Sequence, residues 1–288
     1  MDRTDYVIGI VGAGVMGGGI AQVAAEAGLE TILYDIDPTM LERAATSIAS
    51  SVHRAVEKGK IAPEQAERAV ARIKTARAME DLTPCDTVIE AVPEKIDLKK
   101  RLFFDLERAT RHDAILATNT STLSVTHIAS ALTLPERAIG MHFFNPAQLM
   151  PLVEVIAGAM TSAATVEATL ALARRMGKFP VRVKDTPGFI VNRVARPFYL
   201  EALRVLGEGV TDPATIDQLV REGGGFRMGP FELMDLIGID TNYAASLSMY
   251  EQFFHEPRFR PCLLQQQMVD SGRLGRKTGK GWYDYENP

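Results

Sequence analysis

The sequence predicts a two-domain protein, with an α/β domain built on a parallel sheet and a second, mostly helical domain. Two observations indicate this arrangement. Short apolar runs typical of buried parallel strands alternate with helical stretches through the first part of the chain. A cluster of residues that break secondary structure, Asp185-Thr186-Pro187-Gly188, follows, and the pattern beyond it is helical. We therefore expect domains at residues 1–185 and 186–288.

Length and composition bound the classes of function. The 288 residues are enough for two domains with substantial cores, and 46% hydrophobic with 24% charged residues is typical of a soluble globular protein. A net charge of −4 gives no reason to expect nucleic-acid binding. Cys85 and Cys262 have no metal or redox spacing, which favours a reduced, cytoplasmic setting. The apolar stretch from Val7 to Ala25 is crowded with glycines, so we expect neither a signal peptide nor a membrane span.

The first predicted strand leads into a glycine-rich turn. The apolar run Tyr6–Val11 is followed by Gly12-Ala13-Gly14-Val15-Met16-Gly17 and then by a helical stretch, Ile20–Ala27. In such a turn the first glycine makes the bend, the second admits a pyrophosphate, and the third lets helix and strand pack closely. The helix N-terminus offers N–H groups to the phosphates. This context predicts a Rossmann-type dinucleotide-binding domain.

The residue after the second strand selects the cofactor. The strand Thr31–Tyr34 ends at Asp35, which would accept hydrogen bonds from the adenosine ribose and repel a 2′-phosphate. No arginine follows directly, because Ile36 and Asp37 come next. The sequence therefore favours NAD over NADP.

A helical segment of about residues 39–78 is too long for an ordinary crossover. A break near Gly59–Pro63 predicts two helices in an antiparallel hairpin. Ser51 and Arg54 lie on the same face of the first helix as Lys58, at i−7 and i−4. The basic residues of this helix are Arg43, Arg54 and Lys58. Two interpretations stay open: a solvated face, or a site for a phosphate-bearing ligand.

Two further buried strands end in polar residues. The strand Thr87–Val92 is followed by Pro93-Glu94 and a helix through Leu98 and Leu106, and the strand Ile115–Thr118 is followed by Asn119–Ser124. Polar residues at the carboxyl ends of parallel strands lie where such sheets bind ligands. Ser121 could act there, could cap the helix after Leu123, or could do both.

A histidine and a carboxylate occupy the next two β-type runs. Ile139–Pro146 carries His142, and Pro151–Ile156 carries Glu154. Histidine exchanges a proton near neutral pH, and a buried carboxylate needs a partner, for which His142 is the nearest candidate. The alternative is a core histidine bonded to a backbone carbonyl.

A helix at Thr165–Met176 and a last strand at Phe179–Val183 complete the first domain. Asn192 falls in the first turn of the helical domain, where it could cap the helix or project into a cleft between the domains. The helices expected there are Val191–Leu206, Pro213–Arg221 and Phe231–Ile237 or later.

Taken together, the motifs make the chain resemble the short-chain L-3-hydroxyacyl-CoA dehydrogenases, most closely the bacterial 3-hydroxybutyryl-CoA dehydrogenase type. In chain order they are Gly-Ala-Gly-x-Met-Gly, Asn-Thr-Ser, His-Phe-Phe-Asn-Pro, Leu-Val-Glu-Val, Pro-Gly-Phe-x-x-Asn-Arg and Gly-Arg-Lys-Thr-Gly-x-Gly-x-Tyr. The resemblance covers essentially the whole chain. It implies a Rossmann domain with a helical hairpin insertion, followed by an all-helical domain that forms a homodimer.

The resemblance also implies roles for the matching residues. His142 would take the C3 hydroxyl proton as hydride leaves for the nicotinamide, and Glu154 would orient the imidazole and stabilise its cation. Ser121 and Asn192 would hydrogen-bond the substrate oxygens. Coenzyme A would contact Ser51 and Lys58. The residues implied to bind NAD are Gly12, Gly14, Val15, Met16, Gly17, Asp35, Glu94, Lys99, Ser121, Asn145 and Lys277.

Some features leave other functions open. Ala147–Pro151 departs from the family pattern, which leaves the acyl chain length undecided, and Trp282 replaces a phenylalanine. An NAD-dependent sugar-acid dehydrogenase of the L-gulonate type could share the fold without using coenzyme A. A non-catalytic NAD-binding structural protein is a third interpretation, and it would predict a broken His-Glu-Ser-Asn set. The reaction needs no metal, and no ligand-spaced cluster of His, Cys, Asp and Glu occurs in the sequence.

Overall fold

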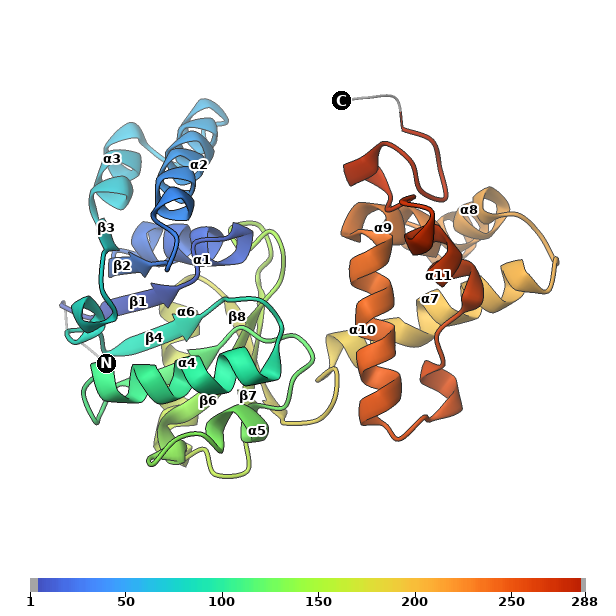
Figure 1. Cartoon of the computed structure of the whole chain (residues 1–288). Helices are drawn as coiled ribbons and strands as arrows, with labels where there is room; N and C mark the ends of the chain where they lie inside the picture. The colour runs from blue at the N-terminus through green and yellow to red at the C-terminus, as the bar shows by residue number, and fades with distance from the viewer. Residues whose placement is uncertain (1–4, 286–288) are drawn as a thin grey trace. The chain divides into compact units, whose positions relative to one another are not determined.

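The structure is a computed structural model that describes residues 5–285. The chain divides into two compact units, Met1–Thr186 and Pro187–Pro288 (Figure 1). Within residues 5–285, none of the helices has both the length and the apolar character that crossing a membrane requires.

The first unit is built on one eight-stranded sheet with the strand order β3-β2-β1-β4-β5-β6-β7-β8. All neighbouring strands are parallel except β6 and β7, which are antiparallel. Every residue of β4 and β5 is buried, because helices cover both faces of a parallel sheet. The strands are β1 (Val7–Val11), β2 (Glu30–Tyr34), β3 (Ile73–Ala76), β4 (Thr87–Glu90), β5 (Ile115–Thr118), β6 (Ala138–Phe143), β7 (Leu152–Ala157) and β8 (Phe179–Lys184).

Two hydrophobic cores flank this sheet. One joins α1 (Val15–Glu26), α2 (Pro38–Glu57) and α6 (Ala163–Arg175) to the sheet. The other joins α4 (Ile96–Ala109) and α5 (Val125–Ala129) to it. The helix α2 and its partner α3 (Pro63–Ala71) form a hairpin that extends beyond the edge of the sheet (Figure 1). The predicted fold class is therefore confirmed.

One part of the predicted hairpin is wrong. The sequence pattern suggested helix up to residue 78, but Ile73–Ala76 forms β3, the edge strand beside β2. The N–H of Thr31 donates to the carbonyl of Arg72 at 3.0 Å and brings the chain back to the sheet directly after α3. Only four residues long, this strand shows too little periodicity to be distinguished from the end of a charged helix.

The second unit is helical. Its core gathers Tyr199, Leu203, Phe231 and Met234. The helices α10 and α11 were not predicted individually. The helices are α7 (Val191–Gly207), α8 (Pro213–Gly224), α9 (Pro230–Ile237), α10 (Ile239–Gln252) and α11 (Leu263–Asp270), and short 3₁₀ turns occur in the chain at Met79–Leu82, Pro135–Arg137, Pro257–Phe259 and Arg276–Thr278.

The C-terminal glycine-rich motif, residues 275–283, packs against α9. The buried carboxylate of Asp235 accepts hydrogen bonds from the backbone N–H groups of Trp282 and Tyr283, each at 3.0 Å. A Cβ atom at Gly275 or Gly281 would collide with Asp235. The glycines of this motif therefore let the C-terminal segment approach α9 closely.

Candidate active site

The three glycines of the first turn differ in what surrounds them. Gly12 has φ +100° and its added Cβ would lie 2.7 Å from the carbonyl oxygen of Ala91, while a Cβ at Gly17 would overlap the carbonyl oxygen of Gly12. A Cβ at Gly14 would meet no atom within 4 Å. Gly14 is also the N-cap of α1, and no side chain caps this helix. The turn is therefore packed tightly at its ends and open in the middle, where a phosphate can meet N–H groups.

Asp35 is tied to this turn. Its Oδ2 accepts the N–H of Ala13 at 2.6 Å, and its Oδ1 accepts the N–H of Asp37 at 2.9 Å. Val15 in the glycine turn keeps 79% of its surface exposed, and Ile36, which follows Asp35 in the chain, keeps 89%. Exposed apolar side chains near an acid and an open turn suit the adenosine half of a dinucleotide.

Glu94 organises the turn that carries Ser121. Its Oε1 accepts the hydroxyl of Thr120 at 2.5 Å and the N–H groups of Ser121 and Thr122 at 2.9 and 3.1 Å. Burial disfavours the charged carboxylate, but Lys99 and these hydrogen bonds outweigh burial and hold the pKa of Glu94 below its ordinary value. Glu94 is thus an anion whose orientation is set by the turn after β5.

The side chain of Lys99 is 1% exposed and lies beneath this turn. Its Nζ lies 3.3 Å from Oε2 of Glu94 and 2.5 Å from Oε1 of Glu90. Glu90 was not identified from the sequence as a site residue. The signal was there, since an acid at the end of an otherwise apolar strand needs a charged partner, and Lys99 follows nine positions later.

His142 and Glu154 are brought together by strand register. In the antiparallel pair β6–β7 the two residues are direct partners, and Nδ1 of His142 lies 2.8 Å from Oε2 of Glu154. Both are buried, with 6% and 1% of their surfaces exposed. The alternative in which this histidine is simply tied to a backbone carbonyl is therefore wrong for Nδ1. A carboxylate at Nδ1 leaves Nε2 as the nitrogen suited to exchanging a proton with a substrate.

The turn with Ser121 lies beside the histidine strand. Thr118 at the end of β5 pairs with Gly140 in β6, and Oδ1 of Asn119 accepts the N–H of Phe143 at 2.8 Å. Ser121 does not cap the next helix. Ser124 is the N-cap of α5, and its hydroxyl accepts the N–H of His127 at 3.1 Å.

Asn145 is exposed and lies in the loop between β6 and β7. Lys178 holds this loop, because its Nζ donates to the carbonyls of Ala147 and Met150 at 2.6 and 3.0 Å. A Cβ at Gly19 would lie 3.2 Å from that of Ala147, so the loop rests directly on α1. The loop that departs from the family pattern is thus anchored to the helix that begins at the glycine turn.

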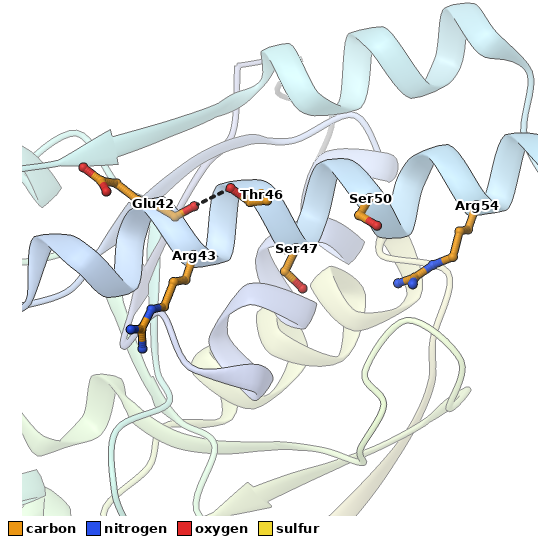
Figure 2. A pocket seen from close by; sticks show the side chains of 6 residues that line it. All are labelled: Glu42, Arg43, Thr46, Ser47, Ser50 and Arg54. Carbon is orange, nitrogen blue, oxygen red and sulfur yellow. Dashed lines mark hydrogen bonds between the residues drawn. The ribbon is translucent and has the colours of Figure 1, made fainter. Parts of the chain in front are cut away.

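The basic face of α2 lines a groove of about 570 Å³ (Figure 2). Arg43, Ser47 and Arg54 project from the same side of the helix. Lys58 is exposed and is the C-cap of α2, and Ser51 is half-buried. The residues that line the groove are Glu42, Arg43, Thr46, Ser47, Ser50 and Arg54, so Ser51 and Lys58 are not among them.

The two remaining site residues belong to the second unit. Asn192 is the second residue of α7, whose N-cap is Ile190, so Asn192 does not cap the helix. Nζ of Lys277 forms an ion pair with Asp240 at 2.6 Å. Within residues 5–285, no group of three or more His, Cys, Asp or Glu side chains is placed to hold a metal ion.

An open glycine turn, an acid after β2 and a buried His–Glu pair define a dinucleotide-dependent oxidoreductase of the Rossmann type. Family models lead to the same class. The model described as 3-hydroxyacyl-CoA dehydrogenase, NAD binding domain, matches residues 7–186, and the model for the C-terminal domain of that family matches residues 188–285. The chain belongs to the 3-hydroxyacyl-CoA dehydrogenase family, and NAD is its cofactor.

Individual relatives agree with this assignment. A probable 3-hydroxybutyryl-CoA dehydrogenase of Bacillus subtilis is 41% identical, with 96% of each chain covered. The crystal structure of (S)-3-hydroxybutyryl-CoA dehydrogenase from Ralstonia eutropha is 42% identical with a TM-score of 0.94, covering 98% of this chain and 99% of that one. A 3-hydroxyadipyl-CoA dehydrogenase of Escherichia coli is 47% identical over 96% of this chain, which spans 58% of that longer relative.

Proposed function

We propose that the protein catalyses the reversible, NAD-dependent oxidation of a short-chain L-3-hydroxyacyl-CoA, such as 3-hydroxybutyryl-CoA, to the 3-ketoacyl-CoA. The observation that carries the proposal is the 2.8 Å contact between Nδ1 of His142 and Oε2 of Glu154. It provides an oriented base near the carboxyl end of β6, and the glycine turn Gly12–Gly17 lies at the carboxyl end of β1. The names of the relatives supply the substrate class.

The protein's own groups handle the proton. NAD, when bound, supplies the hydride acceptor. As the C3–H bond breaks, the C3 hydroxyl must lose its proton, and Nε2 of His142 takes it. The Glu154 carboxylate fixes the tautomer and stabilises the imidazolium that results. In the reverse direction, His142 returns the proton to the carbonyl oxygen.

The other site residues are assigned to binding. Ser121 and Asn192 hydrogen-bond the substrate oxygens, and Ser51 and Lys58 on the hairpin bind coenzyme A. Support for this role of the hairpin comes from the charge of α2, where Arg43 and Arg54 line an open groove. NAD is held by Gly12, Gly14, Val15, Met16, Gly17, Asp35, Glu94, Lys99, Ser121, Asn145 and Lys277.

A division of labour between the domains completes the proposal. Residues 1–185 carry every residue assigned to NAD except Lys277, and residues 186–288 contribute to substrate binding and form a homodimer. Large apolar side chains exposed in the second unit support the dimer, with Val194 71%, Leu219 69%, Leu263 67% and Phe254 93% exposed. The two free thiols, Cys85 and Cys262, suit a reducing cytoplasm. Sedimentation equilibrium tests the dimer, and a monomer at micromolar concentration would contradict it.

The proposed activity is tested by NADH oxidation with acetoacetyl-CoA and longer 3-ketoacyl-CoAs, with NADPH run in parallel. We expect the fastest turnover with acetoacetyl-CoA and NADH. A panel of sugar acids, including L-gulonate, with NAD forms the second arm. Turnover of a sugar acid without turnover of any coenzyme A thioester would reject the proposal, and activity in neither arm would favour a structural role.

A further inference from the structure

Glu90 lies at the point where three elements of the first unit meet. It is the last residue of β4 and is fully buried. Its Oε1 accepts Nζ of Lys99 at 2.5 Å and the N–H of Val92 at 2.7 Å, while its Oε2 accepts the hydroxyl of Thr118 at 2.7 Å. The carboxylate therefore joins the ends of β4 and β5 to the first turns of α4. None of the roles assigned above uses it.

A buried carboxylate is costly unless it is paired and fully hydrogen-bonded. Apolar packing of the same volume would suffice if this position only had to fill the core. The observed contacts instead fix one cation, because Nζ of Lys99 donates two hydrogen bonds and forms an ion pair with a second carboxylate. It donates to Oε1 of Glu90 and to the carbonyl of Val92 at 3.2 Å, and the ion pair is with Oε2 of Glu94 at 3.3 Å.

The shorter of the two ion pairs is the one with Glu90. Lys99 thereby stays close to Glu90 and reaches Glu94 at its Oε2. The other oxygen, Oε1, remains directed at the turn of Thr120, Ser121 and Thr122. Without the charge of Glu90, Lys99 would be neutralised by Glu94 alone. The stronger attraction would draw that carboxylate away from the turn.

We propose that Glu90 is a positioning residue of the active site: by holding Lys99, it keeps Glu94 directed at the turn that presents Ser121. The inference rests on the proposed function, because that function assigns Glu94 to the cofactor and Ser121 to both ligands. Glu90 itself acts through Lys99 and Glu94 and touches neither substrate nor cofactor.

The test is Glu90→Gln, which keeps the shape of the side chain and removes its charge. We expect the Kd for NADH, read by fluorescence, and the KM for NADH to rise, and kcat to fall. The combined loss in kcat/KM is about 10- to 100-fold, as for a misplacement of reacting groups by about 1 Å. A carboxylate with a purely structural role would lower the unfolding midpoint in urea and leave Kd, KM and kcat unchanged.

Glu107→Gln is the matched control in the same unit. Glu107 accepts the N–H groups of Thr133 and Leu134 at 2.8 and 2.9 Å and pairs with the buried Arg137. This variant should lose stability and keep the wild-type Kd and kcat. If Glu90→Gln behaves like Glu107→Gln, the positioning role is overturned.

A second variant serves if Glu90→Gln does not fold. Thr118→Val keeps every charge and removes the hydroxyl that donates to Oε2 of Glu90 and accepts the N–H of Thr120 at 3.2 Å. We expect a smaller rise in the Kd for NADH. An unchanged Kd and kcat in Thr118→Val would then reject the inference. The NADH-binding measurement separates the two proposals, since a wild type that binds NADH and turns over no 3-ketoacyl-CoA refutes the function while the Kd still reports on Glu90.

Discussion

His142 and Glu154 are direct partners across the antiparallel strands β6 and β7, with 2.8 Å between Nδ1 and Oε2. Strand pairing places the two side chains opposite each other, so the backbone itself brings the carboxylate to the imidazole. Both residues are buried, which strengthens the interaction between carboxylate and imidazolium. The orientation of the base therefore exists before a substrate binds.

Replacing His142 tests the base. His142→Gln should lower kcat by about 10²–10⁴-fold, the usual contribution of a positioned acid–base group, and leave NADH binding nearly intact. Glu154→Gln should also lower kcat, because a neutral amide does not stabilise the imidazolium. Steady-state rates and a fluorescence titration with NADH measure both effects. Near-normal turnover by His142→Gln would remove this residue from the mechanism.

Two glycines of the first turn should respond differently to the same substitution. A methyl group at Gly17 overlaps the carbonyl of Gly12, so Gly17→Ala should destabilise the first unit. Gly14 has open space around its Cβ position, so Gly14→Ala should fold normally and bind NADH more weakly, since the methyl group occupies the place of the phosphates. Thermal unfolding and NADH titration separate the two effects. Equal stability losses would contradict the different surroundings of the two positions.

The hairpin can be tested with substrates of different length. Lys58→Ala should raise KM for acetoacetyl-CoA more than KM for a truncated acetoacetyl-pantetheine, which lacks the nucleotide phosphates that a lysine attracts. Arg68→Ala, on the exposed surface of α3, is the control and should change neither KM. Equal effects of Lys58→Ala on both thioesters would count against the hairpin as the phosphate site.

Glu94 makes stability depend on pH in the acid range. Its pKa in the folded protein lies below the ordinary value of 4.5, because Lys99 and hydrogen bonds from Thr120, Ser121 and Thr122 outweigh the opposing effect of burial. The resulting stabilisation is fully present above pH 4.5 and is lost as the pH falls through the lowered pKa. We expect Glu94→Gln to have a lower urea midpoint than the wild type at neutral pH, with the difference shrinking below about pH 4.5.

The control for this pH series is Glu67→Gln, on the exposed side of α3. The difference between its urea midpoint and that of the wild type should stay constant across the pH series. A constant difference between Glu94→Gln and the wild type down to pH 3 would show that the charge of Glu94 does not contribute to stability.

The two cysteines should differ in reactivity. Burial raises the pKa of the Cys85 thiol to about 12, so almost no thiolate is present at pH 8. Cys262 is half-buried at the start of α11. A thiol-reactive dye should therefore label one site in the native protein and both in denaturant. Native Cys262→Ser should remain unlabelled, and rapid labelling of this variant would contradict the burial of Cys85.

Local patterns were enough to predict much of the fold. The turn Gly12–Gly17 follows its strand directly, and the buried strands β4 and β5 each contain adjoining apolar residues, so their signals lie within a few residues. The pairing of His142 with Glu154 was also predictable, because only twelve positions separate them. Strand β3 was missed because pairing with β2, rather than its own sequence, makes it a strand.

Contacts between distant segments could not be predicted in this way. Nothing in the sequence near Glu94 indicates that it accepts the N–H of Ser121, which lies 27 positions later. The bond between Glu90 and Thr118 spans 28 positions in the same manner. Such contacts depend on which strands become neighbours in the sheet, and that order is a property of the whole domain.

The hairpin β6–β7 affects how the two parts of the active site assemble. Closing its short loop costs little entropy, so the acid–base pair can form as soon as one hairpin forms. The turn that binds the dinucleotide instead depends on segments spread from Gly12 to Thr122. The acid–base pair therefore needs the contacts of one hairpin, whereas the cofactor site needs several neighbouring strands in place.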